Sequence, residues 1–203
     1  MKKSLLGLLL AVAMVVPAFA AKGDMSINAK LGLGVDTSVR VSGSGMGDFG
    51  YSLKPDMPFM LGAEFFYGTS DMFSVGFGAN YVFDAEAEVP FGSGAKCEGG
   101  TTNIYVAVKP EFKVESDIIS SVYLIGQFGL SMGRAEAKAS GSSQTFDLDS
   151  GIYLGAGFGA TIKDAFLVEL VFASCNGEIT IEGQSGDIRY SITSVNVGYK
   201  FNI

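Results

Sequence analysis

The chain alternates between apolar residues and small or polar residues with a period of two. In one stretch, Phe73, Val75 and Phe77 occupy every second position, with Ser74 and Gly76 between them. Such alternation is typical of β-strands, in which successive side chains point to opposite faces of a sheet. Eight segments show it, at residues 27–36, 59–67, 73–83, 104–112, 122–132, 152–162, 166–173 and 195–203. Their lengths are close to the ~9–11 residues that a tilted strand needs to cross a bilayer.

The two faces of these segments differ in a way that favours a barrel in a membrane. One face carries bulky apolar side chains such as Leu154 and Phe158, whereas the other is rich in glycine, as at Gly155, Gly157 and Gly159. The interior of an eight-stranded barrel is just wide enough for side chains, so we expect the bulky face to lie outside, against lipid. The glycine-rich face should line a narrow lumen. The three glycines superficially suggest a nucleotide-binding loop, but they alternate along a strand and do not open a helix, so that motif is rejected.

The connections between the segments alternate in length. Short turns are expected at residues 69–71, 115–119 and 163–165, and longer loops at about 42–58, 84–101, 134–150 and 176–187. Barrels of the bacterial outer membrane have short periplasmic turns and longer extracellular loops, and closure leaves no unpaired strand edge in the bilayer. The predicted fold is therefore all-β, an eight-stranded antiparallel up-and-down transmembrane β-barrel.

The N-terminus predicts export. Lys2 and Lys3 precede an apolar run over residues 5–16, and Pro17 and the triplet Ala18-Phe19-Ala20 follow it. This order is typical of a cleaved signal peptide, and the run is well short of the ~20 residues of a spanning helix. We expect a signal peptide over residues 1–20 and one barrel domain over residues 21–203.

Composition excludes several classes of function. The net charge is −7, which gives no electrostatic footprint for nucleic acid. The chain contains no histidine, and a serine or aspartate nucleophile without a general base is inert at neutral pH. We therefore expect a protein that is not an enzyme and that has no cofactor or metal site. Acidic residues in the predicted loops have no spacing that resembles a calcium loop.

Six charged residues fall on the face that should line the lumen. Charges in such a confined space must be paired, because burial of an unpaired charge is costly. We expect a salt-bridge network that plugs and stiffens the barrel, and the alternative is a gated conduit for small ions. The six residues are Lys30, Glu64, Lys109, Glu111, Glu169 and Lys200.

The two cysteines are candidates for a disulfide, because export removes them from the reducing cytosol. Cys97 lies in the second predicted long loop and Cys175 at the start of the fourth. A bond between them would tie a lid over the lumen, provided that their Cα atoms approach within ~7 Å. The sequence leaves both states open.

The C-terminal stretch carries a resemblance to a known family. It has a polar residue, a glycine two positions later, and hydrophobic residues at the antepenultimate and final positions, namely Asn196, Gly198, Phe201 and Ile203. This pattern resembles the assembly signal of bacterial outer-membrane proteins, although that signal usually ends in Phe. The whole predicted barrel resembles the OmpA/OmpX-type eight-stranded outer-membrane barrels, in particular the barrel-only surface antigens without a peptidoglycan-binding domain.

The resemblance implies a Gram-negative outer-membrane protein with outer-membrane lipids and the barrel-assembly machinery as partners. Surface loops vary and carry specificity, so the first functional hypothesis is adhesion, binding of a host or other extracellular partner, or envelope integrity. The alternative is a small channel for ions or hydrophobic solutes.

Overall fold

A computed structural model describes residues 23–43, 51–53, 57–88, 96–139, 142–181 and 184–203. The predicted signal peptide, residues 1–20, lies outside the described residues. The described elements are all strands, and within the described residues no helix is long and apolar enough to cross a membrane. The strands are β1 (Met25–Gly43), β2 (Tyr51–Leu53), β3 (Phe59–Ser70), β4 (Phe73–Glu88), β5 (Lys96–Lys113), β6 (Ile119–Ala139), β7 (Ser142–Ile162), β8 (Phe166–Ile181) and β9 (Gln184–Asn202).

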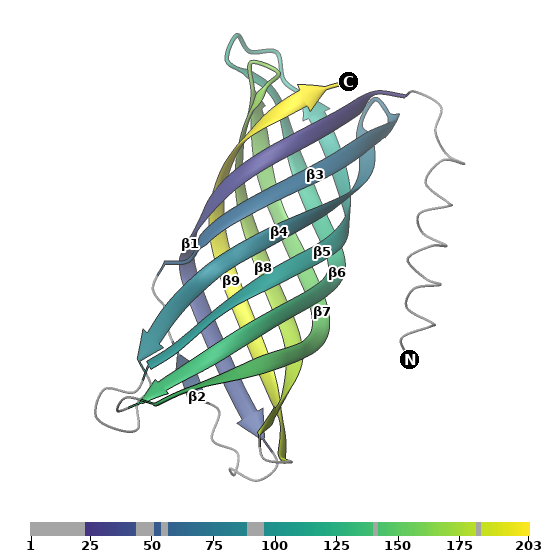
Figure 1. Ribbon diagram of the computed structural model, residues 1–203. Helices are drawn as coiled ribbons and strands as arrows, with labels where there is room; N and C mark the ends of the chain where they lie inside the picture. The colour runs from purple at the N-terminus through teal and green to yellow at the C-terminus, as the bar shows by residue number, and fades with distance from the viewer. Residues whose placement is uncertain (1–22, 44–50, 54–56, 89–95, 140–141, 182–183) are drawn as a thin grey trace.

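Eight of these strands form a closed antiparallel barrel (Figure 1). Each strand from β3 to β9 pairs with the next along the chain, and β1 closes the sheet by pairing with both β3 and β9. The closing pair runs from Ser26↔Asn202 to Gly43↔Gly186. The short strand β2 was not predicted. It pairs with β1 at Val39↔Leu53, in the same register in which β3 pairs with β1 at Leu33↔Phe59. It thus extends the β1–β3 ladder and is not an additional strand of the barrel.

The bulky face points outward, as predicted. Phe77, Leu154 and Phe158 are 61%, 50% and 52% exposed, which excludes an apolar core inside the barrel at these positions. Tyr105 and Tyr153, in contrast, point inward and are almost fully buried. With no water in hydrocarbon to bond backbone groups, closure satisfies the strands and the outer apolar band faces lipid.

The short turns are also where the sequence places them. In the turn between β7 and β8, Lys163 and Asp164 both have positive φ, at 48° and 60°. The N–H of Ala165 donates to the carbonyl of Ile162 at 3.2 Å. Two successive left-handed residues inside such a bond form a type I′ turn, which matches the twist of a hairpin.

The prediction of long loops is mostly wrong, because much of their length is paired β-strand. The strands β6 and β7 stay paired as far as Ala139↔Ser142, and β8 and β9 as far as Ile181↔Gln184. The loop expected at residues 84–101 is also shorter, since β4 ends at Glu88 and β5 begins at Lys96. Beyond the bilayer both faces of a strand meet water, so backbone pairing continues without the apolar alternation from which the strands were predicted.

Candidate functional site: the lumen

The lumen holds the chemistry of this barrel. All six charged residues predicted for it lie on the inward face, and they form two groups. Lys30, Glu64, Lys109 and Glu169 are each no more than 7% exposed. Glu111 and Lys200 are part-buried and lie nearer the short turns. The structure thus has these side chains on the face given by strand parity, that is, by the odd or even position of each residue in its strand. Their role as a plug stays a prediction.

Lys30 is the centre of the first group. Its Nζ lies 2.6 Å from Glu64 Oε1 and 2.9 Å from Glu169 Oε2. The three residues come from β1, β3 and β8, so the ion pairs cross the lumen near the seam that closes the barrel. One cation between two carboxylates at these distances is a buried ionic triad.

Neutral donors also form hydrogen bonds to both carboxylates. Glu64 Oε1 also accepts hydrogen bonds from the Tyr105 hydroxyl and from Gln127 Nε2, each at 3.0 Å. Glu169 Oε1 accepts from the Tyr123 hydroxyl at 2.9 Å. These donors delocalise the excess negative charge of the triad, which a buried charge requires for stability.

Aromatic side chains fill the cross-section around the triad. The Tyr153 hydroxyl donates to Gln127 Oε1 at 2.8 Å, and the rings of Tyr105 and Tyr153 stack with centroids 5.3 Å apart. Glycine makes room for them: a Cβ on Gly159 would lie 2.7 Å from Cζ of Tyr123. Four of these residues were not predicted as part of the site, although their position opposite the bulky face was the available signal: Tyr105, Tyr123, Gln127 and Tyr153.

The second group surrounds Glu111. Its carboxylate contacts Lys109 at 3.2 Å and Lys200 at 3.9 Å, and the Ser121 hydroxyl donates to it at 2.5 Å. The Lys109 ammonium also lies over the rings of Phe66 and Tyr123, at 4.7 Å and 5.0 Å from their centroids. Because Tyr123 bonds Glu169, the two groups form one connected network.

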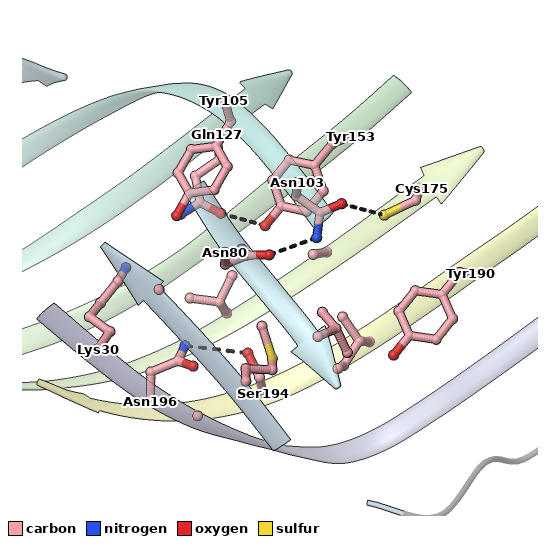
Figure 2. Close-up of a pocket in the computed structure, with 17 residues that line it drawn as sticks. Lys30, Asn80, Asn103, Tyr105, Gln127, Tyr153, Cys175, Tyr190, Ser194 and Asn196 are labelled. Atoms are coloured by element: carbon pink, nitrogen blue, oxygen red, sulfur yellow. Dashed lines mark hydrogen bonds between the residues drawn. The ribbon is translucent and has the colours of Figure 1, made fainter. Parts of the chain in front are cut away.

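A third set of polar contacts lies on the other side of the triad. Asn103 Nδ2 donates to Asn80 Oδ1 at 2.6 Å, and the Cys175 thiol donates to Asn103 Oδ1 at 3.6 Å (Figure 2). The cavity here has about 20 Å³ of space for the centre of a water molecule. Roughly 10–15 Å³ by this measure is needed for one water, so the cavity is water-sized.

The candidate disulfide between Cys97 and Cys175, which the sequence left open, is not formed in the structure, where Cys175 is a free and buried cysteine. Cys175 does not open a loop; it continues the inward face of β8, two positions after Ala173. Its thiol contacts Asn103, and Cys97 lies six residues farther along β5, roughly 20 Å at ~3.3 Å per residue. That separation is far beyond the reach of a disulfide. The Cys97 side chain itself is outside the described residues.

The residues of the predicted assembly signal divide between the two faces. Phe201 and Ile203 are exposed on the outside, and Asn196 points inward, where its Nδ2 donates to the Ser194 hydroxyl at 3.3 Å. A Cβ on Gly198 would lie 2.6 Å from the Ala29 carbonyl oxygen. Close packing against β1 therefore requires glycine at position 198, independently of any role in assembly. The assembly role remains a prediction.

Among the residues that the structure describes, no three histidine, cysteine, aspartate or glutamate side chains are grouped so that they could hold a metal ion.

Comparisons with known proteins agree with this architecture. Among solved structures, Ail, the attachment invasion locus protein of Yersinia pestis, in complex with the heparin analogue sucrose octasulfate, is 15% identical with a TM-score of 0.51, covering 89% of this chain and 99% of that chain. Neisserial surface protein A is 15% identical with a TM-score of 0.51, covering 87% of this chain and 97% of that chain. OprG from Pseudomonas aeruginosa is 14% identical with a TM-score of 0.49, covering 90% of this chain and 97% of that chain. No curated protein matches the sequence.

The sequence also matches a family model directly. The model, described as outer membrane protein beta-barrel domain, covers residues 6–201 and so spans nearly the whole chain. The protein therefore belongs to the outer membrane protein β-barrel domain family and is a protein of the outer membrane.

Proposed function

We propose that this protein is a closed outer-membrane barrel whose extended hairpins act at the cell surface, in adhesion, in binding of a host or partner ligand, or in envelope integrity. The observation that carries the proposal is the filled lumen. The triad of Lys30, Glu64 and Glu169, with its tyrosine donors, crosses the barrel, and the cavity beside it is water-sized. A lumen closed in this way leaves the outer surface as the place of function.

The length of the strands supports a role outside the bilayer. The strands β6 and β7 have 21 residues each. Beyond the predicted membrane segments 122–132 and 152–162, β6 continues over residues 133–139 and β7 over residues 142–151, which is roughly 20–30 Å of paired strand. A paired hairpin of this length offers a partner a surface that is already ordered, which lowers the entropic cost of binding.

The test is a shortened hairpin in the full chain. Residues 135–146 are replaced by Asn-Gly, which joins the register partners Arg134 and Asp147 through a two-residue turn. Both forms are displayed on a non-adherent Gram-negative strain and scored for adhesion to cultured epithelial cells, for retention on immobilised heparin, and for survival in detergent. Heparin is included because the Ail structure contains a heparin analogue.

We expect the shortened form to migrate as a folded, heat-modifiable barrel and to lose at least one of these three properties. If it keeps all three at the level of the full hairpin, the β6–β7 hairpin is not the functional surface and the proposal is overturned for it.

A second candidate is a small channel for ions or hydrophobic solutes. It is favoured by one observation: Lys30 has two carboxylate partners, and among the described residues nothing donates a hydrogen bond to Glu64 Oε2. An exchange of partners could thus move a cation past the triad. Single-channel recording in planar bilayers tests this: reproducible openings that Glu64→Gln or Lys109→Met abolishes would favour transport, and a silent bilayer favours the closed barrel. An enzyme is the least supported class, because the chain has no histidine.

We also propose that residues 1–20 direct export and that the C-terminal residues are recognised by the barrel-assembly machinery. Replacement of Ile203 by Asp should slow the appearance of folded barrel in the outer membrane. Ile203 is 70% exposed and packs little in the fold, so unchanged assembly would argue against the signal.

A further inference from the structure

Two arginines lie directly opposite each other on the outer surface of the barrel, at the seam where β1 meets β9. Arg40 and Arg189 are register partners, and both are exposed. The pair Thr37↔Ile192, three positions away, is buried on the inward face, so strand parity places the arginines on the outward face. Directly opposite side chains in an antiparallel sheet have Cβ atoms ~4.5–5.5 Å apart.

Two guanidinium groups at opposite positions favour an anion between them. Like charges at opposite positions destabilise a sheet. Arg189 Nε donates to Asn176 Oδ1 at 3.0 Å, which fixes that guanidinium and leaves its terminal nitrogens available. No carboxylate of a described residue forms an ion pair with either arginine. The acidic residues nearest in register are Asp187 and its partner Glu178 on β8, two positions farther from the membrane, and Asp36, four residues nearer to it.

The pair lies just beyond the headgroup layer, within reach of its own long side chains. On the neighbouring strand β8, Phe172 is the last outward apolar side chain, and its register partner on β9 is Thr193. Arg189 is four residues beyond Thr193, which is ~13 Å along the strand and ~10 Å along the membrane normal at a tilt of 35–45°. The polar layer of a bilayer extends ~5–8 Å beyond the hydrocarbon, and arginine side chains reach back toward it.

We propose that Arg40 and Arg189 together bind the phosphate of a lipid headgroup in the outer leaflet. Each guanidinium presents a planar fork of donors that matches phosphate oxygens, and two forks around one phosphate replace repulsion by charge-assisted hydrogen bonds. The site would fix the rotational position of the β1–β9 seam against the lipid. The inference rests on the outer-membrane location and is independent of the proposed function.

The test is native mass spectrometry of the full-length barrel in detergent, titrated with phosphatidic acid, which exposes a phosphomonoester, or with phosphatidylcholine of the same acyl chains. The matched control is Lys113→Gln with Lys163→Asn, two exposed residues at the opposite rim, which removes the same charge as Arg40→Gln with Arg189→Gln. Heat-modifiable migration verifies that every form is folded.

We expect the unaltered barrel and the control to bind one phosphatidic acid at least about tenfold more tightly than phosphatidylcholine, and the double arginine variant to lose that preference. Arg40→Lys with Arg189→Lys keeps the charge but not the forks, so it should bind with intermediate affinity. Equal preference in the unaltered barrel and the arginine variant would overturn the site. Displacement of the lipid by millimolar inorganic phosphate would overturn the lipid assignment and leave a site for free phosphate.

Discussion

Removal of Lys30 tests the central feature of the lumen. In Lys30→Met the carboxylates of Glu64 and Glu169 lose the cation at 2.6 Å and 2.9 Å and face each other across the lumen. Breaking a buried ion pair by removing one partner costs ~3–5 kcal/mol, because an uncompensated charge stays buried. The three neutral donors on these carboxylates remain, so we expect the lower half of that range as the loss in free energy of unfolding.

Urea-dependent unfolding of the barrel in lipid vesicles measures the loss, with the heat-modifiable folded band as the signal. Lys200→Met is the control, because its Nζ is 3.9 Å from Glu111 and the side chain is part-exposed, where a pair contributes only ~0–1 kcal/mol. Adding Glu64→Gln and Glu169→Gln to Lys30→Met should recover most of the lost stability. A Lys30→Met barrel as stable as the control, or no recovery in the triple variant, would refute the triad as a source of stability.

Three further perturbations probe the packing, the turns and the free thiol. Gly159→Ala should lower the free energy of unfolding by ~1–3 kcal/mol, because the added methyl group overpacks the lumen. Gly126→Ala is the control and should have little effect, because its Cβ would meet only a valine methyl group, at 3.2 Å. Unfolding in lipid vesicles compares the two variants. Replacing Lys163-Asp164 by Asn-Gly should raise the free energy of unfolding by ~0.5–1 kcal/mol, because Asn-Gly favours the type I′ turn. A lower urea midpoint of unfolding would contradict the turn assignment. In a variant without the other cysteine, Cys175 should react with a maleimide only after unfolding; labelling of the folded barrel would contradict its burial.

Strand parity explains why so much of the barrel could be predicted. Within the bilayer each strand must place apolar groups on lipid and small or polar groups inside, so the period-two pattern fixes the face of every residue. By parity the six charges from Lys30 to Lys200 were expected to face the lumen, and the structure has their side chains there. What they do in the lumen stays a prediction. The same parity would have placed Cys175 inside, had β8 been extended by one more pair of residues.

The partners within the lumen could not be predicted in the same way. Parity gives the face of a residue but not its contacts across the barrel, which depend on the tilt and the register of all strands. Lys30 and Glu169 are 139 positions apart and meet only because β1 closes against β9. The hydrogen bonds of Tyr105 and Tyr123 follow from that closure, so a sequence pattern could show these tyrosines as inward residues without showing what they bind.

The error in the predicted loops shows where the strands leave the bilayer. In residues 134–150 the apolar and polar residues no longer alternate, although the strands stay paired, as at Arg134↔Asp147. Alternation is required only where one face of a strand contacts lipid and the other faces the lumen. The loss of the pattern within a continuous strand therefore marks where the strand leaves the bilayer. Beyond that level the sequence is released from the constraint that shapes the wall and is free to vary for recognition. Under the proposed function, a molecule outside the cell would meet the hairpins at this level, beyond the triad that crosses the lumen.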